Sequence, residues 1–465
     1  MFFCLHISFY SLKINTFAEK NNMKKNFYYL LIIASLNFFI PACSSNDEAS
    51  ALKNEEQTIL DKEHEEGEQQ SNEDIANNPR KDITLSRSEK ELATLNTEFA
   101  FRFLQIANEE LENRSILISP QSASFALSML SNGANGETQN EIKEVLGYEK
   151  FTQDEINGYN QKLMKNLVEL DKTSTMSIAN SLWLDDEFSV RNAYQQVLQD
   201  AYEAKIFVED FTQRSTMSKI NQWCSNKTNG CIPNFLKDWN EKEKIVLVNA
   251  LYFKGKWLMP FEKNKTEKGT FTTVEEISEN IDFMRQTANN WYVKDENVAV
   301  SEFPYGNGAF SMYIILPHEG VSLDEWIKTF DATHWNTMQT KMEIQKMNIW
   351  LPKFKLELYM ADKMTYMLHT MGIVKAFDAK EADFSALSDE NIWIDSVMQA
   401  TYINIDEEGT ESASVTGNGW ISADLGEEEN NSTIDFRANR PFLFILQEKS
   451  TKAILFFGKF GGAEE

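Results

Sequence analysis

The chain has 465 residues, of which 42% are hydrophobic and 12% aromatic, so it can bury a core large enough for one big domain or two. Its formal net charge is −26 and no stripe of Lys and Arg runs along it, which excludes nucleic acid as a partner. The sequence also lacks CxxC pairs, zinc-type spacings and a GxSxG elbow, so we expect no enzyme, no cofactor and no metal site.

Residues 1–43 have the pattern of a secretion signal. Lys24 and Lys25 precede an apolar run that ends in "IPAC", and Met23 is a candidate for the true start. Small residues before Cys43 are similar to the bacterial lipobox, in which that cysteine is lipidated. We therefore predict a lipid anchor at Cys43 that holds the protein in the cell envelope, at the outer membrane, the surface or the periplasmic side. Cleavage by the general signal peptidase, which would give a secreted protein, and an uncleaved membrane anchor remain open.

Residues 44–85 are rich in Asp and Glu and poor in apolar residues, so we expect a solvated, disordered tether before a folded domain at 86–465. His64 lies in this segment without the HExxH spacing of a metalloprotease. The domain itself contains two cysteines, Cys224 and Cys231. In an oxidising envelope these two could form a disulfide or remain free thiols.

The start of the domain favours helices. Apolar residues recur at helical spacing from Leu92 to Ile106, which predicts an amphipathic helix. A short buried strand, "SILI", is followed by Ser119 as an N-cap and Pro120 in the first helical position, which predicts a second helix that ends before Gly133.

A third helix is expected directly afterwards. Thr138 and Glu141 have the spacing of a capping box, and Gly147 stops the apolar pattern.

Later segments favour β-strands because they are dense in β-branched and aromatic residues. We expect strands at 177–184, 244–257, 310–317, 354–358, 442–446 and 453–460. The chain shows no βαβ rhythm and no internal repeat, so the residues predict an antiparallel α+β protein with its helices gathered early.

One long polar stretch interrupts this pattern. After the strand-like run 400–405 comes "DEEGTESASVTGNGWISADL", residues 406–425, with Gly409 followed by a row of small residues. Loops of this length inside a compact domain are uncommon and usually functional.

Several stretches together resemble the serpin family, in the family's order and from about Leu92 to Phe460. They are "ILISPQSASFALSMLSNGANGETQNEI", "VNALYFKGKW", "ADFSAL", "INIDEEGTESAS" and "FRANRPFLFIL". The resemblance implies the serpin fold, with three β-sheets, about nine helices and an exposed reactive-centre loop at about 407–435. It also implies a monomeric inhibitor of serine or cysteine endopeptidases that acts as a suicide substrate: the protease cleaves the loop, forms an acyl ester, and is trapped when the loop inserts into the central sheet.

The hinge of that loop is implied to be Glu407, Glu408, Gly409, Thr410, Glu411, Ser412, Ala413 and Ser414. Gly409 can act as a pivot because glycine adopts backbone angles that other residues avoid. The small residues that follow can enter a sheet without clashes, with Thr410, Ser412, Ser414 and Thr416 facing inward.

The cleaved bond in this family lies about fourteen residues beyond the hinge glycine, which indicates Ala423 and Asp424. Cleavage at Ala423 would suit an elastase-like protease, and the alternatives Trp420, Ile421 and Leu425 would suit chymotrypsin-like or papain-like proteases. None of these residues is Arg or Lys, which disfavours trypsin-like targets.

Positions under the central sheet also match the family. In this family the shutter is a set of polar positions under the central sheet, and the breach is the place where loop insertion starts. The residues that correspond to the shutter and breach are Ser119, Ser122, Asn180, Asn249, Trp257 and Gln399. Each can equally be read as an ordinary buried, hydrogen-bonded residue. Gln399 stands where the family often has His, so pH sensing through that site is not expected.

The loop departs from the family pattern in its second half. Gly417 and Gly419 weaken strand propensity, and Trp420 is bulky for an inserted strand. These residues leave an alternative open: a non-inhibitory serpin that serves as a binding or adhesion module.

Overall fold

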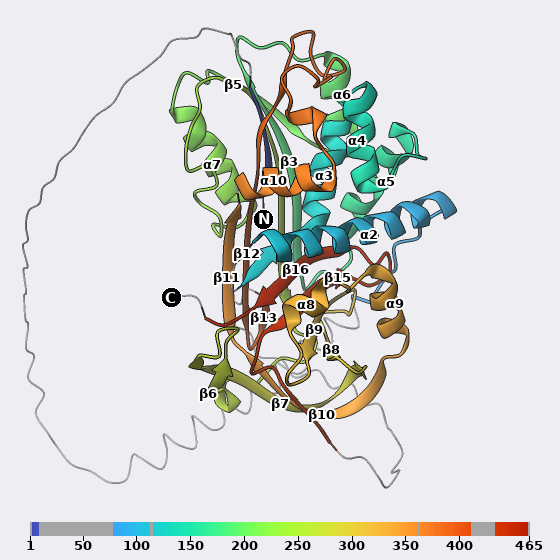
Figure 1. The fold of residues 1–465 in the computed structure, drawn as a ribbon, viewed down its shortest axis with the longest axis vertical. Helices are drawn as coiled ribbons and strands as arrows, with labels where there is room; N and C mark the ends of the chain where they lie inside the picture. Colours follow the sequence, from blue (N-terminus) through green and yellow to red (C-terminus); the bar gives the residue numbers. More distant parts are fainter. Residues whose placement is uncertain (1, 9–77, 112–114, 361, 411–432, 464–465) are drawn as a thin grey trace, which may run out of the picture.

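The computed structural model describes residues 2–8, 78–111, 115–360, 362–410 and 433–463 (Figure 1). These residues form an α+β fold with nine α-helices. The helices are α2 (Arg87–Glu110), α3 (Pro120–Ser131), α4 (Gly136–Leu146), α5 (Gln153–Leu167), α6 (Asn192–Tyr202), α7 (Ser215–Lys227), α8 (Leu323–Ile327), α9 (Ala332–Thr340) and α10 (Asp362–Met371). In Figure 1, α3 to α6 gather at one end of the molecule, as the sequence predicted.

A seven-stranded sheet forms the centre of the molecule. Its strands are β11 (Phe354–Met360), β12 (Trp393–Asp406), β13 (Gly409–Thr410), β1 (Phe2–Ser8), β5 (Glu243–Lys256), β3 (Thr175–Asp185) and β4 (Lys205–Glu209). β12 and β5 are its long inner strands, and both β13 and β1 lie between them. We call this the central sheet.

The second sheet has nine strands. They are β14 (Ile434–Arg437), β10 (Glu343–Pro352), β7 (Ser278–Lys294), β6 (Glu267–Thr272), β8 (Val298–Pro304), β9 (Phe310–Pro317), β15 (Phe442–Glu448), β16 (Ile454–Phe460) and β2 (Ile116–Ile118). β7 pairs with β6 at one end and with β8 at the other. This long strand therefore joins two of the three expected sheets into one.

Helix α3 supports the central sheet from beneath. All of its residues are buried, and the Ser119 hydroxyl caps it by accepting a hydrogen bond from the Ser122 amide at 3.2 Å. The predicted cap and the Pro120 start are confirmed. The predicted capping box of α4 is wrong, because the helix begins at Gly136 with Asn135 as its N-cap.

The N-terminal boundary of the domain lies earlier than expected. Ile83 and Leu85 are buried, and Asn78 donates a hydrogen bond to the Asp171 carboxylate at 2.7 Å, so residues 78–85 pack on the domain and are not tether. The chain start also differs from expectation, because Phe2–Ser8 forms a strand of the central sheet and does not lie outside the fold.

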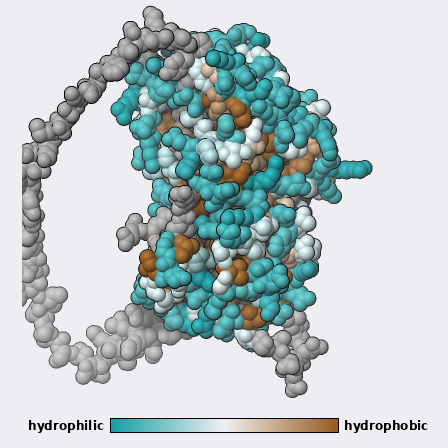
Figure 2. All heavy atoms as spheres, in the orientation of Figure 1, coloured by the Kyte–Doolittle hydropathy of each residue, from teal (hydrophilic) through white to brown (hydrophobic). Residues whose placement is uncertain are grey.

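The surface in view is mostly hydrophilic, with small, separated hydrophobic patches (Figure 2). No helix within the described ranges is both long and apolar enough to span a bilayer.

Candidate functional site: hinge, breach and shutter

The hinge begins where β12 ends. The chain turns at Glu407 and Glu408, and β13 runs back antiparallel, pairing Gly409 with Asp406 and Thr410 with Ile405. On its other edge β13 pairs with Lys256 and Gly255 of β5. The first two residues after the turn therefore already occupy a strand position inside the central sheet.

Gly409 is required by this geometry. Its φ is +146°, and a Cβ at this position would lie 2.0 Å from the Gly255 carbonyl oxygen. A side chain here would be strained and would also collide with the neighbouring strand. Gly409 therefore occupies a position that only glycine fits, and its role as a pivot stays a prediction.

Trp257 holds the hinge turn through backbone contacts. Its amide donates to the Glu408 carbonyl at 2.8 Å, and its indole Nε1 donates to the Asp406 carbonyl at 2.9 Å. The ring stacks on Tyr305 with centroids 4.4 Å apart, and the Tyr305 hydroxyl lies 2.6 Å from Thr410 Oγ1. Trp257 thus contacts the turn between β12 and β13, and its role in the breach stays a prediction.

A buried carboxylate fixes the same turn from the other side. Glu407 is 4% exposed, lies 2.8 Å from Lys353 Nζ, and accepts a hydrogen bond from Thr266 Oγ1 at 2.7 Å. Burial alone would raise the pKa of Glu407, but the hydrogen bonds from Lys353 and Thr266 and the charge of Lys353 outweigh it and lower the pKa below its ordinary value. Glu407 is therefore an ionised anchor for the hinge.

A series of buried hydrogen bonds crosses the central sheet at the residues predicted to form the shutter. Gln399 of β12 exchanges hydrogen bonds with the backbone of Ser119, with both distances 3.2 Å. The Ser122 hydroxyl donates to Asn249 of β5. Asn249 in turn donates to Asn180 of β3 at 2.7 Å.

The chain of hydrogen bonds ends at the backbone. Asn180 donates to the Tyr202 carbonyl at 2.7 Å. All five side chains are at most 2% exposed, so the chain ties β12, α3, β5 and β3 together without help from bulk water. The structure brings together every residue predicted for the shutter.

Other predicted residues lie outside the described residues. They are Cys43, Glu411, Ser412, Ala413, Ser414, Trp420, Ile421, Ala423, Asp424 and Leu425. Cys224 and Cys231 are described, and no disulfide joins them in the structure.

Sequence reasoning missed three partners of the hinge: Lys353, Thr266 and Tyr305. Lys353 is 54 residues from Glu407, Thr266 is 141 residues from it, and Tyr305 is 105 residues from Thr410. No local pattern marks them. The signal in the sequence is the pair of carboxylates, Glu407 and Glu408, directly before Gly409. A buried carboxylate requires a cation nearby, so such a pair indicates a basic partner from elsewhere in the chain.

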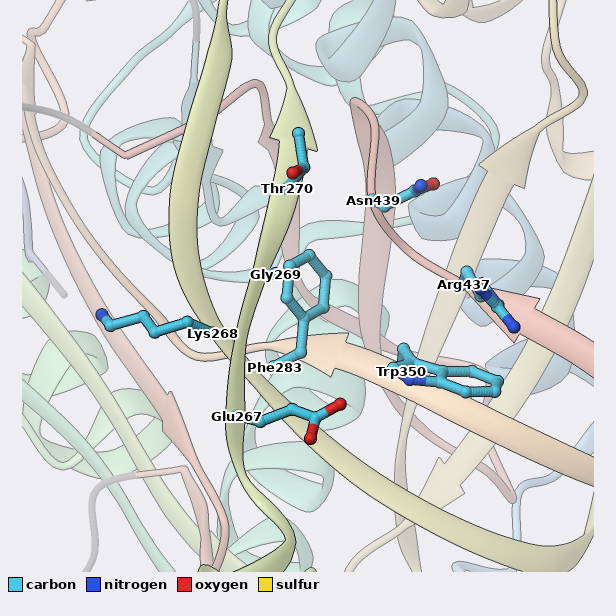
Figure 3. A pocket seen from close by; sticks show the side chains of 8 residues that line it. All are labelled: Glu267, Lys268, Gly269, Thr270, Phe283, Trp350, Arg437 and Asn439. Atoms are coloured by element: carbon cyan, nitrogen blue, oxygen red, sulfur yellow. The ribbon is translucent and has the colours of Figure 1, made fainter.

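A small pocket of about 160 Å³ lies on the outer part of the second sheet, beside β14 (Figure 3). One of its lining side chains is Trp350, whose ring lies 4.1 Å from the Arg437 guanidinium and 5.1 Å from that of Arg285. Pockets for small molecules usually exceed about 300 Å³, so we assign this one no ligand. The stacked arginine fixes β14, the first described strand after the reactive loop. Within the described ranges, no cluster of His, Cys, Asp and Glu could hold a metal ion.

Comparison with known proteins agrees with this geometry. The family model for "Serpin (serine protease inhibitor)" matches residues 94–461. The leukocyte elastase inhibitor of Xenopus tropicalis is 30% identical over 398 residues, covering 79% of this chain and 98% of its own.

Two solved structures are similar along nearly their whole length. The thermophilic serpin tengpin in its native state is 30% identical with a TM-score of 0.72, covering 83% of this chain and 97% of its own. Human thyroxine-binding globulin complexed with thyroxine is 25% identical with a TM-score of 0.73, covering 81% of this chain and 100% of its own. The chain belongs to the serpin family.

Proposed function

We propose that this serpin is a suicide-substrate inhibitor of serine endopeptidases, and of cysteine endopeptidases as a related class. The observation that carries the proposal is β13, because Gly409 and Thr410 are paired on both edges inside the central sheet. A loop whose first residues are already strand-paired can extend the same strand after cleavage. Inhibitor-named relatives at about 30% identity support a general role in protease inhibition.

The sequence around the expected bond suggests the target. Ala423 and Asp424 fit an elastase-like protease, whereas cleavage after Trp420, Ile421 or Leu425 fits chymotrypsin-like or papain-like proteases. We further propose that the inhibitor acts as a monomer tethered to the cell envelope through a lipid on Cys43. The support for the anchor is the signal-like segment that ends in "IPAC".

The test uses a chain that begins at Ser71, which keeps the packed residues from Asn78 onward. It is incubated with elastase-like, chymotrypsin-like and papain-like proteases, and the products are separated in denaturant. We expect a denaturant-resistant covalent complex with at least one protease, and the mass of the released loop fragment identifies the cleaved bond. Cleavage of the loop by every protease without any such complex would refute the proposal.

A second candidate is a non-inhibitory binding module. Gly417, Gly419 and Trp420 favour it because they disfavour a long inserted strand, and thyroxine-binding globulin has a similar fold and is seen in complex with thyroxine. The discriminating measurement is the melting temperature of the same chain before and after loop cleavage. Insertion adds a strand to the sheet and should raise the melting temperature, whereas an unchanged value favours the binding module.

A further inference from the structure

The N-terminal strand β1 fills part of the gap that β13 enters. Phe2 to Ser8 pair with β12 from Ala400 to Trp393 on one edge and with β5 from Ala250 to Glu243 on the other. β13 and β1 both run antiparallel to β12 and β5, so they point in the same direction. Figure 1 shows β1 as the dark blue strand beside β5. The two segments therefore occupy the two ends of one strand position.

The pairing register shows which loop residues would pair with the same residues of β12 and β5 that now pair with β1. Between the two segments lie positions 401–404 of β12 and 251–254 of β5. A strand that continues from Thr410 in the same register fills these positions with residues 411–414. It then reaches Ala400 and Ala250, the two partners of Phe2, at Val415, and both edges give this same result.

Continued further, Val415 to Gly419 fall at the places of Phe2 to His6, up to a bulge between His6 and Ile7. Two segments of one chain cannot pair with the same backbone groups at once, so β1 and the second half of the loop exclude each other.

The amino-acid composition of β1 suits a strand better than that of the loop residues which would take the same places. Residues 2–8 read "FFCLHIS", with two Phe, a Leu and an Ile, whereas the loop residues for the same places start "VTGNG". Aromatic and β-branched residues favour strands and glycine disfavours them. The half of the loop that suits a sheet poorly is thus the half whose place β1 holds.

β1 also crosses the shutter. Phe3 is the register partner of both Gln399 on β12 and Asn249 on β5, two of the three strand residues in the buried hydrogen-bond chain. With β1 present, these two strands are held apart at the level where the shutter ties them to α3.

We propose that Phe2–Ser8 is a built-in competitor for the strand position of the reactive loop, so that the loop can insert fully only after β1 has left. The inference rests on the proposed inhibitory function and adds a regulation to it. The segment 411–414 can insert with β1 in place, and insertion then stops before Val415.

Removal of residues 1–42 takes β1 away and leaves the strand position between β12 and β5 to the loop.

A cross-link tests the position of β1. Native Cys4 is the register partner of Val248, and paired residues of antiparallel strands have Cα separations that a disulfide can span. We would introduce Val248→Cys into the full chain, oxidise it mildly, and identify the link by peptide mapping. The matched control carries Cys4→Ser as well, which leaves every other cysteine in place. Met398→Cys, on the other edge of Cys4, is the second variant if the first folds poorly.

The functional readout uses a labelled peptide of residues 411–421, whose binding does not require a protease to be trapped. We expect the chain that begins at Ser71 to bind the peptide, the reduced full chain to bind it more weakly, and the oxidised full chain to bind it least. Covalent protease trapping should follow the same order.

Each other outcome has a definite meaning. Failure of both Cys4 links to form would overturn the placement of β1. Peptide binding by the oxidised full chain that equals the binding by the chain from Ser71 would overturn the competition. If the chain from Ser71 binds the peptide but traps no protease, the inhibitory function fails while the competition stands.

Discussion

At the scale of single residues, Glu407 connects ionisation to the stability of the hinge. Its pKa is lowered below the ordinary value of 4.5, so its stabilisation is fully present above pH 4.5 and is lost as the pH falls through the lower folded-state pKa. We expect Glu407→Gln to lower the free energy of unfolding by about 1–3 kcal/mol at neutral pH, because it loses charged hydrogen bonds with Lys353. Urea denaturation at neutral pH and below pH 4.5 measures the effect.

The control for this prediction is Glu325→Gln, which changes an exposed carboxylate paired with Lys328. It should alter stability by less than about 1 kcal/mol. The difference between wild type and Glu407→Gln should shrink in acid. If the difference stays constant down to low pH, Glu407 is not the ionised anchor that its contacts indicate.

Asn249 is the residue on which the shutter depends most. Its side chain accepts from Ser122 and donates to Asn180, so Asn249→Ala leaves two buried polar groups without these partners. We expect a loss of about 2–4 kcal/mol in the free energy of unfolding, whereas Asn226→Ala on the exposed face of α7 should cost far less. Equal losses for the two variants, measured by urea denaturation, would contradict the importance of the buried chain.

The sequence predicted single residues correctly where their role depends only on neighbours in the sequence. Ser119 before Pro120 predicted the start of α3 because capping involves only neighbours. The same logic failed for α4, because the Thr138 hydroxyl instead accepts from the Asp383 amide and the Glu141 carboxylate accepts from the amides of Val374 and Lys375. Both side chains bind segments more than 200 residues away, which no local pattern records.

At the scale of elements, the two-residue strand β13 is where the proposed loop insertion would begin. Gly409→Ala should prevent its pairing, because the added Cβ would lie 2.0 Å from the Gly255 carbonyl oxygen. We expect the loop to be cleaved as before while the covalent complex falls relative to cleaved product by about tenfold or more, as a change of about 1.4 kcal/mol in the insertion barrier would produce. Denaturing electrophoresis after reaction with a trapped protease measures this ratio.

Gly320→Ala is the matched control for this element. Gly320 also has a positive φ, of +83°, but no atom lies within 4 Å of its added Cβ. The control therefore carries comparable backbone strain without the clash. A similar loss of complex in both variants would assign the effect to general instability and not to β13.

Three strands of the central sheet, β3, β5 and β11, were predicted from β-branched, aromatic or alternating residues, and the run 400–405 marked the end of β12, whereas β4 was not predicted. The sequence also predicted the loop after β12, but it gave no sign of β1. "FFCLHIS" lies far from its partners and just before a signal-like segment, and only the open strand position between β5 and β12 gives it a place. Pairing of this kind depends on the whole sheet and not on the segment.

At the scale of the whole molecule, the net charge of −26 should govern which proteases the inhibitor meets quickly. The arm after the expected bond adds Glu427, Glu428 and Glu429 near the site of attack. We expect complex formation with a basic protease to slow several-fold as salt rises from about 0.01 M to about 1 M, since the screening length falls from about 30 Å to about 3 Å. Stopped-flow measurement of the second-order rate constant tests this.

Replacing the three arm glutamates by Gln should weaken the salt dependence, because steering acts most strongly where the protease docks. The matched control replaces three exposed glutamates of α2, Glu91, Glu98 and Glu109, which changes the net charge by the same amount. If both triple variants lose the same part of the salt dependence, the field of the whole molecule does the steering. An acidic protease should show the opposite trend, reacting faster as salt rises, because screening then removes a repulsion between two negative surfaces.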